Sequence, residues 1–304
     1  MKYPRVAGIA GRVNKANCLK RIAIVLCWLI AAALPSYASR TVTDETGRVV
    51  VVPDHPHRII CLVPSITDAV FAIGAADDVV AVSDYVKYPP EAMKKPSVGS
   101  ILSPSMEMVL ALHPDLVLGM PRQNQPAVLA QLQRFGIPLY IVDPHGIAGI
   151  LRSVVSLGQA TGRETQATAL ASQLQSRIDA VRARIRNLPV VNVYMPISYD
   201  PVITIGKGSF ITDIIEAAGG HSITSDINQE WPHISMEAVI ARAPQALLML
   251  RGGTITLDML KERPGWDDLP AVKTRRIYYV DKRVSFPSPV AIDALEDLAK
   301  QFHP

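Results

Sequence analysis

"SMEMVLALHP" occupies residues 105–114, and "SMEAVIARAP" occupies residues 235–244. Six of the ten positions are identical, and the second segment begins 130 residues after the first. In each segment a serine, a methionine and a glutamate precede an apolar run that ends at a proline. A match of this kind within one chain of 304 residues indicates that a structural unit is present twice.

Two further pairs of segments support the duplication. "ITDAVFAIGA" at 66–75 resembles "ITDIIEAAGG" at 211–220, and "YIVD" at 140–143 resembles "YYVD" at 278–281. Their offsets are 145 and 138 residues, so three blocks recur in one order while the loops between them differ in length. Two copies with so long a period predict a pair of similar lobes and exclude a solenoid.

Within each copy, short apolar runs alternate with helical patterns. In the first copy we expect strands at 58–65, 79–83, 115–120 and 138–143, and helices at 66–74, 105–113 and 125–136. In the second copy we expect the same alternation from 190 to 281. Short, continuously apolar strands between helices indicate parallel sheets covered on both faces. The predicted fold class is therefore α/β, with two Rossmann-like lobes whose sheets are mainly parallel.

A long helix is predicted between the two copies. From Glu164 to Asn187, apolar residues recur at spacings of three and four, as expected for one face of an amphipathic helix. They are Ala167, Leu170, Ala171, Leu174, Ile178, Val181 and Ile185. A helix of about 24 residues is roughly 36 Å long. Because a helical tie limits hinge closure, we expect a largely pre-formed cleft between the lobes.

The first 38 residues have the pattern of a signal peptide. Six basic residues and no acidic one accompany the apolar run "IAIVLCWLIAAAL" at 22–34, and small residues precede a predicted cut after Ala38. The 13 apolar residues of this run are too few to span a bilayer, which needs about 18 to 20. We therefore expect export, cleavage and release into the periplasm, the alternative being an uncleaved membrane anchor.

Removal of this segment changes the charge and the cysteine content. The net charge of +4 for the full chain becomes −2, from 25 basic and 27 acidic residues, which disfavours nucleic acid as a partner. Cys61 remains as the one cysteine, so no intrachain disulfide is possible, and its apolar surroundings indicate a core residue. The predicted organisation is an N-terminal lobe at 39–146, a connecting helical region at 147–188 and a C-terminal lobe at 189–304.

No catalytic residue and no resident metal site are predicted. "ITIGKGS" at 203–209 lacks the first glycine of a phosphate-binding loop, and no nucleophile elbow is present. The seven histidines are scattered, with only His55 and His57 close together, whereas a zinc site needs three or four converging ligands. A zinc or manganese receptor and an unrecognised periplasmic enzyme stay open as alternatives.

Four segments together resemble the periplasmic receptors for iron complexes and vitamin B12, and are most similar to the vitamin B12 receptors. They are "SDYVKYPPEA" at 83–92, "SMEMVLALHPDLVL" at 105–118, "ITIGKGSFITDIIEAAGG" at 203–220 and "EWPHISMEAVIARAP" at 230–244. The resemblance extends from about Arg48 to the C-terminus. It implies a class III periplasmic binding protein, which is a substrate-binding component of an ABC importer and not an enzyme.

The resemblance also implies the cargo and the partners. The cargo would be a cobalt or iron chelate, with a corrinoid such as cobalamin favoured and a ferric siderophore or haem as alternatives. A monomeric receptor would deliver it to a permease dimer driven by an ATPase. The matching residues Glu107 and Glu237 would dock on the two permease subunits, one from each lobe. Alternatively, they are first-turn carboxylates of helices that Ser105 and Ser235 cap.

Ligands of open α/β lobes bind at the carboxyl ends of the strands. The residues that we expect there are Pro64, Ser65, Tyr85, Arg122, Ile203, Trp231, Arg251 and Phe286. Tyr85 and Trp231 match aromatic ligand-contacting positions of the family, and flat rings suit a planar macrocycle. Ile101 and Ile203 depart from the family by replacing aromatic residues, and we expect Phe286 to compensate for this loss. Arg122 and Arg251 would pair with an anionic chelate or stay solvated.

Overall fold

The computed structural model describes residues 38–121, 123–262 and 264–304. The predicted signal peptide up to residue 37 and the predicted ligand residue Arg122 lie outside these ranges. Within them, no helix is both long enough and apolar enough to cross a membrane.

The N-terminal lobe contains a four-stranded parallel sheet in the order β4-β3-β5-β6. Its strands are β3 (Ile59–Cys61), β4 (Val79–Val82), β5 (Leu116–Gly119) and β6 (Leu139–Ile141). Its helical segments are α2 (Pro64–Ala72), η1 (Ala76–Asp78), η2 (Ala92–Lys94), α3 (Met106–Ala111) and α4 (Pro126–Arg134). Every residue of β3, β5 and β6 is buried, as expected for parallel strands covered on both faces.

The C-terminal lobe contains a second four-stranded parallel sheet, in the order β10-β7-β11-β12. Its strands are β7 (Val191–Tyr194), β10 (Gly220–Ser222), β11 (Ala246–Arg251) and β12 (Ile277–Asp281), with a small antiparallel pair β8 (Pro196–Ser198) and β9 (Ile203–Thr204) beside them. Its helical segments are α7 (Phe210–Ala217), α8 (Met236–Ala241), α9 (Leu257–Lys261), η3 (Trp266–Asp268), α10 (Pro270–Lys273), η4 (Lys282–Ser285) and α11 (Ala291–Phe302).

The two sheets have the same topology. Counted along the chain, the four strands of each parallel sheet lie side by side in the order second, first, third, fourth. The predicted pair of similar parallel-sheet lobes is thereby confirmed. The chain moves from β3 to β4 on one side and then to β5 on the other, and β7, β10 and β11 repeat this. Such a reversal leaves a crevice at the carboxyl ends of the strands, where ligands of open sheets bind.

The first helix starts earlier than its apolar pattern predicts. β3 ends at Cys61, and α2 begins at Pro64 instead of Ile66. Proline suits the first helical position because its fixed φ is already helical and its missing N–H would have no intrahelical partner there. Pro64 and Ser65 therefore lie in the first turn of a helix and not at the end of the strand predicted at 58–65.

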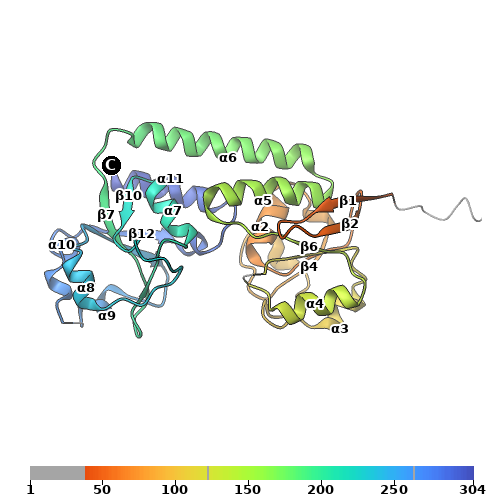
Figure 1. Ribbon diagram of the computed structural model, residues 1–304, viewed down its shortest axis with the longest axis horizontal. Helices are drawn as coiled ribbons and strands as arrows, with labels where there is room; N and C mark the ends of the chain where they lie inside the picture. The colour runs from red at the N-terminus through yellow and green to blue at the C-terminus, as the bar shows by residue number, and fades with distance from the viewer. Residues whose placement is uncertain (1–37, 122, 263) are drawn as a thin grey trace, which may run out of the picture. The chain divides into compact units, whose positions relative to one another are not determined.

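Two helices, not one, connect the cores of the lobes. The predicted long helix is α6 (Glu164–Ile185), with 22 residues, and α5 (Gly146–Thr161) packs against it. On α5, Ile147 and Ile150 lie in the C-terminal core, whereas Val154 and Leu157 lie in the N-terminal core. Figure 1 shows α6 running alongside α5 and reaching α11, so the tie is a layer of packed helices.

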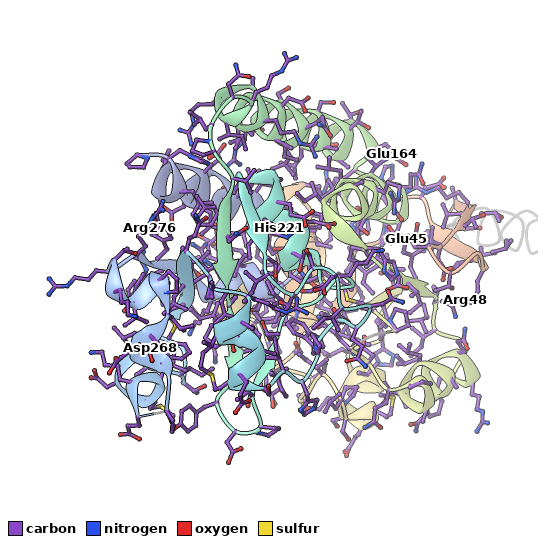
Figure 2. All side chains as sticks on the ribbon, turned by 60° about the vertical axis from the view of Figure 1, so that its left-hand side comes forward. Glu45, Arg48, Glu164, His221, Asp268 and Arg276 are labelled. Atoms are coloured by element: carbon purple, nitrogen blue, oxygen red, sulfur yellow. The ribbon has the colours of Figure 1, made fainter. Side chains whose placement is uncertain are left out.

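An N-terminal hairpin is attached to this tie. It consists of β1 (Ser39–Thr43) and β2 (Val49–Pro53), and the guanidinium of Arg40 forms an ion pair of 2.9 Å with Glu164 at the start of α6. Figure 2 labels Glu164 near the hairpin, together with Glu45 and Arg48 of its turn. Glu45 accepts hydrogen bonds from the backbone N–H of Asp143, at 2.6 Å, and from the Ser153 hydroxyl, at 2.9 Å. The hairpin is thus joined both to the connecting helices and to the end of β6.

Candidate ligand-binding cleft

Two cavities between the lobes, both formed by described residues, are lined by predicted ligand residues. The first, here called the basic cavity, has a volume of about 230 Å³. It is lined by Pro64, Ser65, Asp68, Tyr85, Lys87, Tyr88, Lys282, Arg283, Phe286, Ser288 and Val290. The second, here called the tryptophan cavity, has a volume of about 160 Å³. It is lined by Met120, Gln123, Pro144, His145, Gly146, Gly208, Phe210, Glu230, Trp231, Ser285 and Pro287.

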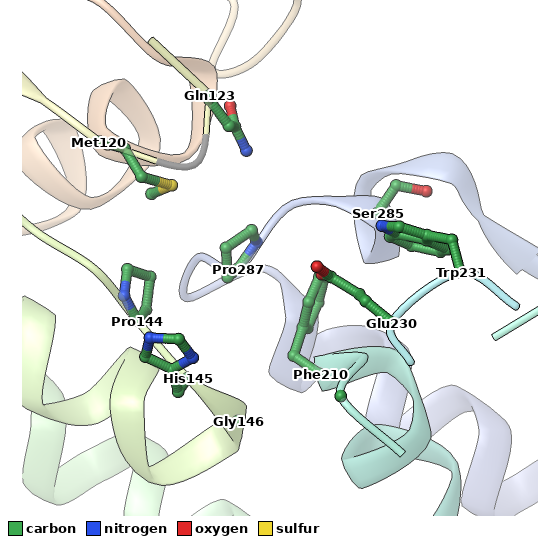
Figure 3. Close-up of a pocket in the computed structure, with 11 residues that line it drawn as sticks. Met120, Gln123, Pro144, His145, Gly146, Phe210, Glu230, Trp231, Ser285 and Pro287 are labelled. Carbon is green, nitrogen blue, oxygen red and sulfur yellow. The ribbon is translucent and has the colours of Figure 1, made fainter. Parts of the chain in front are cut away.

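One crossing segment, Ser285–Ser288, separates the two cavities. Ser285 and Pro287 line the tryptophan cavity, whereas Phe286 and Ser288 line the basic cavity. Phe286 has an extended backbone, and successive side chains of extended chain point to opposite sides. In Figure 3, Met120 and His145 lie on one side of the tryptophan cavity and Glu230 and Trp231 on the other, with Pro287 between them.

Some of the predicted ligand residues line the two cavities and others do not. Pro64, Ser65, Tyr85 and Phe286 line the basic cavity, and Trp231 lines the tryptophan cavity. Ile203 lines neither, but its strand β9 forms a bridge to His233, two residues after Trp231. Arg251 is the exposed last residue of β11 and also lines neither cavity. Arg122 lies outside the described residues.

Several lining residues were not predicted from the sequence. Lys87 and Tyr88 follow Tyr85 within "SDYVKYPPEA", a segment whose second tyrosine was the available signal. The guanidinium of Arg283 lies 4.7 Å from the centroid of the Tyr88 ring, a cation–π contact between the lobes. Arg283 also pairs with Asp281 at 3.0 Å, and this carboxylate raises the pKa of the guanidinium. No local sequence pattern indicated that η4 would meet Tyr88.

The basic cavity also contains buried polar groups. Asp68 on α2 is only 7% exposed, and burial raises its pKa even though Ser288 and the backbone N–H of Val290 donate hydrogen bonds to it. The hydroxyl of Ser65, one turn earlier, is buried and finds no hydrogen-bond partner among the described residues. Exposed Lys87 and Lys282 lie at the edge. The cavity thus combines aromatic rings, positive charge and an available hydroxyl.

The duplicated helices have the capping geometry that the sequence suggested as an alternative to docking. The Ser105 hydroxyl accepts a hydrogen bond from the backbone N–H of Met108 at 3.3 Å, and that of Ser235 accepts one from Ala238 at 3.2 Å. Glu107 and Glu237 lie in the first turns with exposed side chains. The backbone N–H of Glu237 and the Ser235 side chain lower the pKa of Glu237. Capping fixes where both carboxylates lie and leaves them accessible.

No group of three or more His, Cys, Asp or Glu side chains that could hold a metal ion occurs among the described residues. His57 of the predicted close pair contacts Asp78, with its Nδ1 at 2.9 Å from the carboxylate. Burial raises the pKa of the Cys61 thiol to about 12, which keeps it in the unreactive protonated form.

The model of the periplasmic binding protein family matches residues 59–284, which include both sheets and the connecting helices. The chain belongs to the periplasmic binding protein family. The resemblance seen in the sequence is thereby confirmed, and the chain is the substrate-binding component of an ABC transporter and not an enzyme. Members of this family act outside the cytoplasm.

Two bacterial substrate-binding proteins are similar to the chain over most of its length. The chain is 28% identical to the substrate-binding lipoprotein YvrC of Bacillus subtilis (strain 168), over 87% of this chain and 85% of that protein. It is 26% identical to the vitamin B12-binding protein of Vibrio vulnificus (strain CMCP6), over 81% of this chain and 89% of the relative.

Solved structures of this periplasmic binding protein family have the same fold. The periplasmic heme-binding protein RhuT from Roseiflexus sp. RS-1 is 31% identical, with a TM-score of 0.74 over 81% of this chain and 98% of RhuT. The vitamin B12-binding protein BtuF of Vibrio cholerae is 25% identical, with a TM-score of 0.71 over 81% of this chain and 96% of BtuF. The predicted class III fold is confirmed.

Proposed function

We propose that this periplasmic binding protein captures a flat metal chelate, a corrinoid or a haem, in the cleft between its lobes. The observation that carries the proposal is that aromatic side chains from both lobes line the two cavities. Tyr85 and Tyr88 come from the N-terminal lobe, and Phe210, Trp231 and Phe286 come from the C-terminal lobe. Rings bury a large area at low entropic cost against the face of a planar macrocycle.

The volumes indicate how such a cargo would lie. Each cavity is smaller than the roughly 300–1,000 Å³ typical of small-molecule sites. A macrocycle would therefore extend across both cavities and contact the crossing segment between them, with Phe286 beneath it. The helical tie between the lobes favours a cleft that is largely formed before the cargo arrives.

Two cargo classes are favoured by different observations. The resemblance of the sequence favours a corrinoid, as in the vitamin B12-binding relatives. The basic side chains at the cavity, Lys87, Lys282 and Arg283, favour haem, because its carboxylates would pair with them whereas the amide groups of a corrinoid are neutral. The charge of the bound chelate is thus the property that separates the two candidates.

The partners follow from the transport role. We propose that a signal peptide ending at Ala38 directs the chain to the periplasm, where it acts as a monomer. The exposed carboxylates of Glu107 and Glu237, one on each lobe, would dock on the two subunits of a permease driven by an ATPase. Because the two lobes share one topology, two equivalent docking points fit a two-fold symmetric partner.

A titration tests the cargo. Residues 39–304 are purified and titrated with cobalamin, haem and a panel of ferric siderophores while tryptophan fluorescence is recorded. Trp231 is 40% exposed at the cleft, whereas Trp266 is fully buried in the C-terminal lobe. We expect saturable quenching by one tetrapyrrole and most of that change to be lost in Trp231→Phe. Binding of a siderophore alone, or of none of the three classes, would overturn the proposal.

A further inference from the structure

The duplicated "ITD" motif has a structural role beyond its helices. Its aspartates, Asp68 and Asp213, are equivalent residues 145 positions apart. Asp68 lies on α2, the first helix of the N-terminal lobe, and Asp213 lies on α7, the corresponding helix of the C-terminal lobe. The Asp68 carboxylate meets Ser288 and Val290 of the C-terminal lobe, and the Asp213 carboxylate meets the first turn of α5, the helix that leaves the N-terminal lobe.

The contacts of the two aspartates are reciprocal. Asp68 accepts hydrogen bonds from the side chain of Ser288 and, at 3.4 Å, from the backbone N–H of Val290, which immediately precedes α11. Asp213 accepts a hydrogen bond from the backbone N–H of Ile147, the second residue of α5. Because α11 follows β12 and α5 follows β6, each aspartate binds the start of the helix that follows the last strand of the other lobe.

We infer that Asp68 and Asp213 form a reciprocal clasp that holds the two lobes at one angle and so sets the width of the cleft. The inference goes beyond the proposed function and does not depend on which cargo is bound. The duplication would thus produce two equivalent interlobe contacts, in addition to the two proposed docking points.

The local chemistry supports a clasp. The N–H groups of a first helical turn lack intrahelical partners and lie at the positive end of the helix dipole, so a carboxylate suits them. Neither α5 nor α11 has a capping side chain from its own N-cap residue. Asp213 accepts from the first turn of α5, and Asp68 accepts from the residue before α11, so the two aspartates act as the missing caps. Burial raises the pKa of both carboxyls, so these are desolvated groups with fixed partners and not freely solvated charges.

Gly146 lets the carboxylate of Asp213 approach the start of α5 closely. Gly146 begins α5 with a φ of +65°, and a Cβ added there would overlap the carboxylate of Asp213. Position 146 therefore requires glycine for two reasons: its backbone is left-handed, and a side chain there would have no space beside Asp213. Asp213 lines neither cleft cavity, so its replacement tests the clasp without removing a cargo contact.

The test measures the distance between the lobes. Spin labels are attached to Gln133→Cys on α4 and Glu262→Cys after α9, both exposed, while the buried Cys61 stays unlabelled. Double electron–electron resonance then gives the distance distribution in the absence of cargo. We expect Asp68→Ala, Asp213→Ala and Gly146→Ala each to shift and broaden it. Glu216→Ala, an exposed charge on the same helix as Asp213, is the matched control and should leave it unchanged.

The possible outcomes separate a clasp from ordinary helix caps. Caps that act only within one lobe would lower the melting temperature in the variants without moving the interlobe distance, and this result would overturn the inference. Should an alanine variant fail to fold, the near-isosteric Asp213→Leu, which cannot accept a hydrogen bond from the backbone N–H of Ile147, is measured in its place with the same two outcomes. Because no cargo is added, failure of the proposed function would not affect the result.

Discussion

Asp44 holds the turn of the N-terminal hairpin with one buried carboxylate. It accepts hydrogen bonds from the Thr46 hydroxyl at 2.7 Å, from the backbone N–H of Arg48 at 3.0 Å and from the Arg48 guanidinium at 2.6 Å. Burial alone would raise the pKa of Asp44, but these hydrogen bonds from Thr46 and Arg48 outweigh it and lower the pKa below 3.8. Asp44→Asn should therefore reduce the free energy of unfolding by about 2 kcal/mol at pH 7, the range for hydrogen bonds to a charged group.

The pH dependence of this loss has a defined sign. A carboxyl with a lowered pKa in the folded state contributes stability above its unfolded pKa and loses it as the pH falls through its folded pKa. The difference between wild type and Asp44→Asn should thus be constant above about pH 5 and shrink below pH 3.8. Denaturant unfolding at a series of pH values measures it. The exposed Asp77→Asn serves as the control, and an equal loss there would contradict the prediction.

Tyr85 tests the aromatic character of the cleft. Its side chain is 57% exposed at the basic cavity, so little packing is lost on truncation in the unbound protein. Tyr85→Ala should raise the Kd for the tetrapyrrole about tenfold, equivalent to about 1.4 kcal/mol of ring contact. Tyr279→Ala removes a ring that is 42% exposed and lines neither cavity, and should leave the Kd unchanged. Equal effects of the two substitutions would count against a cargo face at Tyr85.

At the scale of elements, Glu107 on α3 and Glu237 on α8 have two candidate roles. They either dock on the permease or only stabilise the first turn of a capped helix. Glu107→Lys together with Glu237→Lys should abolish uptake of the cargo by cells and leave its affinity for the purified protein unchanged. Ser105→Ala with Ser235→Ala is the matched pair, because it removes the caps at about 1 kcal/mol each and keeps both carboxylates. If the serine variant loses uptake while the lysine variant retains it, the glutamates have no docking role.

The packing of α5 on α6 depends on a glycine. A Cβ at Gly158 would overlap the Cβ of Ala167 and lie 3.1 Å from the carbonyl oxygen of Arg163. Gly158→Ala gains about 1 kcal/mol of helix propensity but overpacks the contact by about 1–3 kcal/mol, so overpacking should prevail. We expect a net loss of about 1 kcal/mol in denaturant unfolding. The exposed Ser172→Ala on α6 should be neutral or slightly stabilising. A more stable Gly158→Ala would show that the helices can separate.

For the whole molecule, the repeat and the apolar periodicity predicted two parallel-sheet lobes and a helix close to the observed α6. The connecting helical region predicted at 147–188 covers α5 as well as α6, but the apolar residues of α5 carry no mark of which core they enter, so its contacts with both cores were not predicted. The site was predicted in part for a related reason. Tyr85, three residues after β4, and Trp231, which matches an aromatic position of the family, could be anticipated, whereas Arg283 reaches Tyr88 only through the packing of two distant segments.

The central claim is that the cargo lies between the lobes, across the crossing segment Ser285–Ser288. A crystal structure of residues 39–304 with the tetrapyrrole that saturates the fluorescence titration tests it most directly. The account predicts one face of the macrocycle against Phe286, its edges towards Tyr85 and Trp231, and any carboxylates towards Lys87 and Lys282. A cargo bound elsewhere, for example in the groove between α5 and α6 lined by Leu151 and Ala171, would contradict it.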